Sequence, residues 1–211
     1  MTLRWRKADE SIKLVHCPDH VSKNIFYART YTVRQGFSYS DTNQLVINLK
    51  HAPTSGPGPL GYKRQAIQRF AEEASAFFTH NVGFQFLVVP MPPSRPKGHA
   101  EHDDRLERVA AGIASSCANV VVSAVLETRV DSGSYHDGGM RSAEGCYRSL
   151  AVVEIERQRW GRSTGRCICI LDDILTSGAH FEAGRRHMKE QFPDDQVIGV
   201  FWAKAEEIQG L

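Results

Sequence analysis

One stretch decides the fold: Cys167-Ile168-Cys169-Ile170-Leu171-Asp172-Asp173-Ile174-Leu175-Thr176-Ser177-Gly178-Ala179-His180. An apolar run stops at two adjacent carboxylates, and a short turn with hydroxyl groups and a glycine follows. The next residues, 181–190, have the pattern of a helix. This order predicts a buried parallel strand that brings an acidic pair and a phosphate-binding turn to one edge of a sheet.

The residue types in this stretch indicate a particular chemistry. Asp172 and Asp173 are expected where the strand ends, one facing the site and the other supporting it. Adjacent carboxylates accept hydrogen bonds from neighbouring sugar hydroxyls and also bind a hard cation such as Mg²⁺. The turn at 176–178 offers hydroxyls and a close backbone approach, and the helix behind it directs unpaired N–H groups at an anion. The stretch therefore predicts a site for a phosphorylated sugar.

Three other interpretations share parts of this pattern. Receiver domains also carry an acidic pair at a strand end, but after their first strand, whereas Asp172 lies near the end of the chain. Phosphatases with an Asp-x-Asp motif need one residue between the acids, and here there is none. A purely structural turn is the third alternative.

The stretch resembles the phosphoribosyl pyrophosphate (PRPP) loop of the type I phosphoribosyltransferases. That loop has four apolar residues, two acids, two apolar or variable residues, and a Thr/Ser-Thr/Ser-Gly-x-Thr/Ser turn. The chain departs only at the last place, where His180 replaces a hydroxyl residue and would either donate a ring N–H or crowd the turn. The resemblance implies that Asp172 and Asp173 hold the ribose hydroxyls, with Mg²⁺ bound directly or indirectly. It assigns the 5′-phosphate to Thr176, Ser177, Gly178, Ala179 and His180.

Composition limits the alternatives. A chain of 211 residues fits one domain, with room for an elaborated N-terminal part. A net charge of +2 disfavours a general nucleic-acid binder, and no stretch reaches the ~20 apolar residues of a membrane span. The first residues lack the apolar core of a signal peptide. Five cysteines, two of them in the expected buried strand, favour free thiols in a reducing compartment, so we expect a cytoplasmic protein.

The segment His16-Cys17-Pro18-Asp19-His20 raises the question of zinc, because it places three soft or borderline ligands, two histidines and a cysteine, within five residues. No Cys-x-x-Cys pair exists to complete a tetrahedral site. We therefore interpret the segment as a polar turn.

The N-terminal part is expected to contain strands and one long helix. Residues 25–33 form a strand-like run, and 45–50 form a second apolar run that is either a strand or a short helix. Turn-forming residues lie between them, and three prolines and three glycines over 53–61 argue against regular structure there. Residues 62–79 have the clearest helical pattern, with one apolar stripe made by Ile67, Phe70, Ala71, Ala74, Phe77 and Phe78.

The rest of the chain alternates strands and helices. Strands are expected at 83–90, 119–126, the central stretch and 196–203. Between the first two we expect a helix that is capped by Asp103 or Asp104 and has an apolar stripe made by Leu106, Val109, Ala110 and Ile113. Residues 127–166 are a long connection in which 150–155 returns to the structured body. The alternation predicts an α/β protein with a central, mainly parallel sheet flanked by helices, in the manner of the type I phosphoribosyltransferases. Residues 1–80 would form an N-terminal β/α elaboration or hood, and residues 81–211 the core.

A second loop is expected at the same sheet edge. Pro90-Met91-Pro92-Pro93-Ser94-Arg95-Pro96-Lys97-Gly98-His99 follows an apolar strand, and its cations suit a departing diphosphate, although a rigid solvated loop is the alternative. The loop resembles that of the competence protein F family, whose strand ends in Pro-x-Pro before basic residues. This resemblance assigns pyrophosphate binding to Pro92, Arg95 and Lys97. The family's aromatic-Asn step and its four-cysteine zinc finger are missing from this chain.

Two further segments carry candidate residues. In the phosphoribosyltransferases a flexible loop closes over PRPP, and the corresponding residues are 127–149, with candidates Tyr135, His136, Arg141 and Arg148. The basic stretch Arg157, Arg159, Arg162 and Arg166, with Trp160 between, would contact a nucleic-acid backbone or form a solvated surface.

Together these patterns predict a PRPP-dependent phosphoribosyltransferase-like enzyme. It would bind PRPP with Mg²⁺ and transfer phosphoribose to a nitrogen nucleophile, releasing pyrophosphate. The alternatives are a non-catalytic regulator that binds a phosphosugar or nucleotide, or an accessory protein of DNA processing with a partner protein. A homodimer is compatible with such a fold, no membrane association is expected, and no acceptor pocket is recognisable in residues 1–80.

Overall fold

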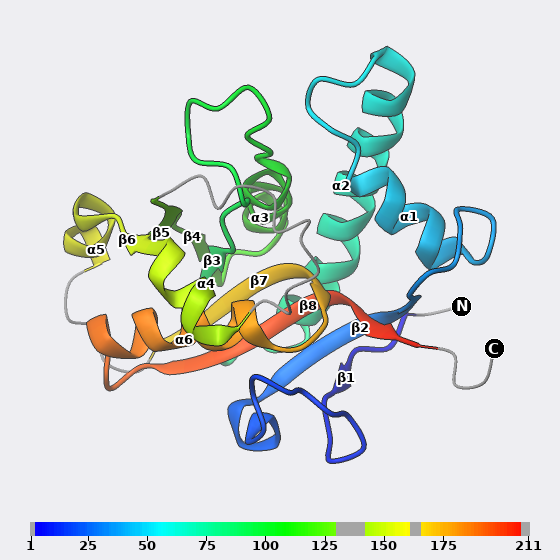
Figure 1. Cartoon of the computed structure of the whole chain (residues 1–211). Helices are drawn as coiled ribbons and strands as arrows, with labels where there is room; N and C mark the ends of the chain where they lie inside the picture. The colour runs from blue at the N-terminus through cyan, green and yellow to red at the C-terminus, as the bar shows by residue number, and fades with distance from the viewer. Residues whose placement is uncertain (1–2, 130–141, 161–165, 208–211) are drawn as a thin grey trace.

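The computed structural model describes residues 3–129, 142–160 and 166–207. Its centre is a six-stranded sheet with the order β1-β2-β8-β7-β3-β4 (Figure 1). Every neighbouring pair in this sheet is parallel except β1 with β2. The predicted α/β class with a mainly parallel central sheet flanked by helices is therefore confirmed.

The strands of the central sheet differ in length. β7 and β8 are the longest; β7 is buried along almost its whole length and β8 over Val197–Ala203, as expected for strands covered on both faces. The strand bounds are β1 Arg6–Lys7, β2 Ile25–Thr32, β3 Phe86–Pro90, β4 Val120–Val122, β7 Cys167–Leu175 and β8 Gln196–Glu206. A separate antiparallel pair is formed by β5 Leu126–Thr128 and β6 Leu150–Val152.

Helices cover both faces of the sheet. α2 packs on α3, whereas α6 packs on α4 and lies on the near side of the sheet in Figure 1. The helix bounds are α1 Asp41–Leu49, α2 Pro57–Thr79, α3 Arg105–Ser116, α4 Ala143–Ser149, α5 Glu154–Trp160 and α6 Ala179–Gln191, with a short 3-10 turn at His20–Lys23. The predicted apolar stripes of α2 and α3 are buried. In the part of the chain that the structure describes, no helix has the length and apolarity needed to cross a bilayer.

One open alternative in the N-terminal part is resolved, and one expectation there was wrong. The run at 45–50 belongs to helix α1, which begins after Ser40, whose hydroxyl accepts the N–H of Asn43. Regular structure also begins within the loop expected at 53–61, because α2 starts at Pro57. Proline is tolerated in a first helical turn, where its missing N–H would have no intrahelical partner.

The strand expected at 119–126 is divided between two sheets. β4 ends at Val122, and β5 begins at Leu126 in the two-stranded sheet with β6. β7, in turn, is longer than expected, since its pairing with β8 continues past the acidic pair to Leu175. The acidic pair therefore lies within a strand rather than after it.

Residues 1–80 share the central sheet with the rest of the chain. β2 lies beside β8 in parallel register, from Ile25 opposite Gly199 to Thr32 opposite Glu206. The side chain of Asn43 bonds both backbone groups of Thr32, which anchors the start of α1 at the carboxyl end of β2. The hairpin of α1 and α2 consequently stands at the carboxyl edge of the sheet (Figure 1).

Candidate functional site

A cavity of about 410 Å³ lies at the carboxyl ends of β3 and β7. Its walls come from four separate parts of the chain. Asp172 and Asp173 belong to β7, Pro92 and Arg95 to the loop after β3, Arg105 to α3 and Lys50 to the end of α1. The two loops predicted to meet at one sheet edge therefore do so.

The strand arrangement explains why the acidic pair opens into this cavity. β3 pairs with β7 only as far as Pro90 opposite Leu171, while β8 continues beside β7. Asp172 and Asp173 thus lie just beyond the last pair on the β3 side. Successive side chains of a strand point to opposite faces, so Asp172 meets α6 and Asp173 meets α3.

Asp173 is buried and held by cations. Its Oδ2 accepts hydrogen bonds from Nε and Nη2 of Arg105 at 3.2 and 2.8 Å, and Lys50 Nζ lies 3.6 Å away. Burial opposes ionisation, but the charges of Arg105 and Lys50 outweigh it and hold the pKa of Asp173 well below its usual range. Asp173 is therefore a carboxylate at neutral pH.

A second carboxylate holds Arg105 from the other side. Oδ2 of Asp103 accepts from Arg105 Nη1 at 2.7 Å and from Lys63 Nζ at 2.6 Å. Lys63 also donates to the backbone oxygen of His51 at 2.7 Å. Burial lowers the pKa of Lys63 despite the nearby Asp103, while the two carboxylates raise the pKa of Arg105 in spite of its own burial. The guanidinium is thus fixed between Asp103 and Asp173.

Asp172 makes a different set of contacts. Its Oδ1 accepts the backbone N–H of Asp173 at 2.8 Å, and its Oδ2 lies 3.5 Å from Nδ1 of His180. Burial disfavours a charged imidazole, but interaction with Asp172 raises the pKa of His180 well above its ordinary value. A protonated His180 adds positive charge to a turn where the resembling family has a hydroxyl.

The turn predicted to bind phosphate encloses its own small cavity of about 60 Å³. Gly178 has a φ of +83° and precedes α6 without a side-chain cap hydrogen bond, so no capping side chain covers the start of the helix, the end that attracts anions. The predicted residues Thr176, Ser177, Gly178, Ala179 and His180 all line this cavity. Asp172, Thr176 and His180 also line the larger cavity, so the two cavities adjoin.

An N-terminal segment supports the turn from behind. The backbone N–H of His16 donates to the backbone oxygen of Ser177 at 3.0 Å. A Cβ at Gly178 would lie 2.9 Å from Cβ of Cys17 and 3.4 Å from Cβ of Leu14. Segment 14–17 therefore leaves no room for a side chain at position 178.

In segment 16–20, which raised the question of zinc, the positions of His20 and Cys17 are explained by contacts within the protein. Both ring nitrogens of His20 lie within hydrogen-bond distance of backbone oxygens, of Cys17 at 3.1 Å and of Asp9 at 2.9 Å. Cys17 is buried under the turn. Among the described residues no group of three or more His, Cys, Asp and Glu side chains is placed to hold a metal ion.

The predicted pyrophosphate loop is only partly in the site. Pro92 and Arg95 line the larger cavity, and the guanidinium of Arg95 lies 3.7 Å from Glu101. Lys97 is exposed and does not line it. The hydroxyl of Thr128 donates to the backbone oxygen of Pro93 at 2.7 Å, which fixes the loop against β5.

Of the four candidates for a covering loop, Tyr135, His136 and Arg141 lie outside the described residues. Arg148 is on α4, its side chain is 78% exposed, and it pairs with Glu144 at 2.9 Å. It does not line the two cavities at the acidic pair.

The basic stretch is neutralised in part by its own helix. Arg157 pairs with Glu154, and Arg159 lies 3.9 Å from Glu156. The guanidinium of Arg166 lies 5.5 Å from the ring centre of Trp160, and Arg162 is outside the described residues. A nucleic-acid contact by this stretch stays a prediction.

Four charged residues of the site were missed from the sequence: Lys50, Lys63, Asp103 and Arg105. Asp103 was considered only as a helix cap, and Lys50 was placed in a strand or short helix. Arg105 directly follows two acids at the start of a helix behind the second loop, and this position was the one available signal. Their pairing with Asp173 depends on contacts across the fold.

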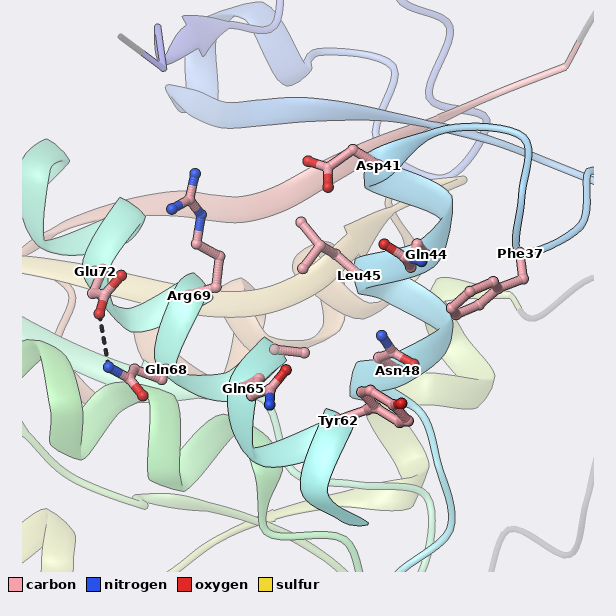
Figure 2. Close-up of a pocket in the computed structure, with 11 residues that line it drawn as sticks. Phe37, Asp41, Gln44, Leu45, Asn48, Tyr62, Gln65, Gln68, Arg69 and Glu72 are labelled. Carbon is pink, nitrogen blue, oxygen red and sulfur yellow. Dashed lines mark hydrogen bonds between the residues drawn. The ribbon is translucent and has the colours of Figure 1, made fainter. Parts of the chain in front are cut away.

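A larger cavity of about 670 Å³ lies between α1 and α2 (Figure 2). In Figure 2 the ring of Tyr62, from α2, lies beside Asn48 of α1, and Gln68 bonds Glu72 at 2.9 Å along α2. Neither the acidic pair nor the phosphate turn lines this cavity. Its size alone does not indicate chemistry, and the candidate site remains the cavity of about 410 Å³ at the acidic pair.

Comparison with protein-family models and with curated proteins found no match for this chain.

Proposed function

We propose that the protein binds PRPP or a related phosphosugar together with Mg²⁺ and transfers its phosphoribosyl group to a nitrogen nucleophile, releasing pyrophosphate. One observation carries this proposal. The acidic pair and the glycine turn line two adjoining cavities, and Asp172, Ile174, Thr176 and His180 are common to both. A phosphorylated sugar needs this arrangement of an anion-binding turn beside hydrogen-bond acceptors.

The turn supplies the binding energy for the 5′-phosphate. Charge-assisted hydrogen bonds from the first-turn N–H groups, the hydroxyls of Thr176 and Ser177 and the ring of His180 are each worth about 1.5–3 kcal/mol. Four or five of them, after the cost of association, correspond to roughly micromolar affinity. This affinity suits a metabolite rather than a tightly held prosthetic group.

The carboxylates act on the sugar. Ribose hydroxyls donate hydrogen bonds, and Asp172 and Asp173 offer acceptors at the mouth of the turn. Departure of pyrophosphate leaves positive charge on the ribosyl ring in the transition state. Fixed carboxylates near that ring stabilise the charge more in the transition state than in the bound substrate, which is the requirement for catalysis.

The residues present fit a magnesium ion that arrives with its substrate. Mg²⁺ commonly uses one or two carboxylates, substrate phosphates and waters rather than a complete protein cage. Asp172 and Asp173 would hold it, directly or through water, and the ion would neutralise the departing diphosphate. Arg105 already occupies Oδ2 of Asp173, so Asp172 is the more available oxygen ligand.

A non-catalytic role is the second candidate, and two observations favour it. Asp173 is already bonded by Arg105, and His180 stands where a hydroxyl is expected. A phosphosugar-binding regulator needs the turn but no acceptor. Pyrophosphate release measured with PRPP and a panel of bases and amines separates the two: turnover with any acceptor excludes the regulator, and tight binding without turnover supports it.

The proposal is tested by calorimetry with PRPP and Mg²⁺. The double variant Asp172→Asn, Asp173→Asn should lose binding by about 100-fold or more, since each lost charge-assisted bond costs about 1.5–3 kcal/mol. Asp194→Asn, at an exposed position outside the site, is the matched control and should bind as the wild type does. Unchanged affinity in the folded double variant would remove the basis of the proposal.

A further inference from the structure

Lys50 enters the site from an unexpected direction. It is the residue at which α1 ends, and its Nζ lies 3.6 Å from Oδ2 of Asp173. Its side chain is 44% exposed, whereas that of Lys63 on the same hairpin is 3% exposed. Lys50 therefore brings a positive charge from the hairpin of α1 and α2 to the wall of the cavity of about 410 Å³ at the acidic pair.

A count of the charged residues around Asp173 shows one positive charge more than the carboxylates neutralise. Lys50, Lys63 and Arg105 are positive, while Asp103 and Asp173 are negative, so the cluster has one surplus positive charge. Lys63 and Arg105 are bonded to the two carboxylates at 2.6–3.2 Å. The contact of Lys50 is longer than a normal hydrogen bond and is only an ion pair through space. The surplus charge therefore resides on Lys50.

The position of Lys50 also suits a ligand contact. A cation at the C-terminus of a helix is favoured by the helix dipole, which keeps the base of the side chain beside the cavity. The four-carbon stem of lysine is flexible, and its ammonium binds phosphate as a compact point charge. An incoming anion would compete with Asp173 for a contact that is already long.

We propose that Lys50 binds the diphosphate of the phosphosugar, in the cavity that Arg95 also lines. The inference depends on the proposed function, because it assumes a phosphosugar diphosphate in this cavity. The location of the two cavities distinguishes the phosphates. Lys50 and Arg95 line the cavity of about 410 Å³ at the acidic pair. Neither lines the cavity of about 60 Å³, where the turn would hold the 5′-phosphate. Lys50 thus belongs to the diphosphate end of the site.

The test separates the two ends of the ligand by using two probes. Calorimetry is performed with inorganic pyrophosphate in the presence of Mg²⁺, and separately with ribose 5-phosphate. Lys50→Met should weaken pyrophosphate binding by about tenfold or more, the effect of one lost ionic hydrogen bond, and leave ribose 5-phosphate within about twofold. Lys50→Arg, which keeps the charge, should restore most of the affinity for pyrophosphate. Lys7→Met, on the exposed strand β1, is the matched control.

Each outcome has one meaning. Equal pyrophosphate binding by the wild type and Lys50→Met refutes the role of Lys50 and leaves the proposed function intact. Equal weakening of both probes by Lys50→Met also refutes it, because Lys50 would then act through Asp173 or the fold. A wild-type protein that binds neither probe would overturn the proposed function, and this inference with it. Urea unfolding of each variant establishes that it is folded.

Discussion

Replacing Gly178 by alanine is expected to destabilise the protein through two separate effects. The residue has a φ of +83°, where an L-residue costs about 1–2 kcal/mol relative to glycine. The new Cβ would also lie 2.9 Å from Cβ of Cys17, closer than ordinary contact. Cβ of Cys17 is attached directly to the backbone, so relief requires segment 14–17 to move, and such overpacking costs about 1–3 kcal/mol. The expected loss is about 2–5 kcal/mol of unfolding free energy.

Gly98→Ala provides a matched control within the same chain. Gly98 has a φ of +92°, and a Cβ there would have no atom within 4 Å. The change in unfolded-state entropy, about 0.4–1 kcal/mol, is the same in both variants and cancels. The difference between the two variants therefore measures the steric effect of Leu14 and Cys17 alone.

The assay is urea unfolding at fixed pH, with stability compared at equal m-values. Gly178→Ala should be less stable than Gly98→Ala by about 1–3 kcal/mol. The reasoning would be refuted if the two variants lost equal stability. In that case the N-terminal segment would not restrict the phosphate turn.

Three further predictions concern buried ionisable groups. Glu73→Gln should cost about 3 kcal/mol, because buried Glu73 accepts hydrogen bonds from Nε and Nη2 of Arg29, and breaking a buried pair is strongly destabilising. Burial favours the neutral form of Glu73, but these hydrogen bonds outweigh it and lower the pKa of Glu73 below the ordinary value of 4.5. The stabilisation by ionised Glu73 should therefore be complete above pH 4.5 and be lost as the pH falls through the lowered pKa, as urea unfolding at several pH values would show. Burial raises the pKa of Cys17 to about 11 and of Cys167 to about 12, so both thiols should resist iodoacetamide at pH 8 until the protein unfolds, as mass spectrometry would show. The raised pKa of His180 should keep its imidazole charged at pH 7.5 in NMR titrations, and Asp172→Asn should lower that pKa. The contribution of charged His180 to stability should be complete below pH 6.5 and be lost as the pH rises through the pKa of the folded state.

Local patterns predicted much of the sheet. The apolar runs at β2, β3, β7 and β8 and the stripes of α2 and α3 were recognisable because burial imposes a period on the sequence. The errors fell where local signals conflict. Prolines at 57 and 59 indicate a loop, yet they occupy a helix start, and the apolar run at 45–50 suited either a strand or a helix.

The candidate site was predictable in its motif and not in its supporting charges. The acidic pair and the glycine turn are contiguous, so their order along the chain determines their chemistry. Arg105 is 68 residues from Asp173 along the chain. Lys50 is farther still, at the end of α1, in a run for which the sequence allowed either a strand or a short helix. Nothing in their local sequence distinguishes them from surface cations.

The sequence by itself determined the α/β class and the segment that carries the acids and the turn, because both depend on residues close together in the chain. The tertiary structure decided which carboxylate is held by Arg105, which cation faces the cavity, and why position 178 admits only glycine. These features arise where the end of α1 and the start of α3 meet β7 and segment 14–17 packs under the turn. The physical reason is that electrostatic and steric interactions act over a few ångströms of space, and only the folded chain brings these distant residues within that range.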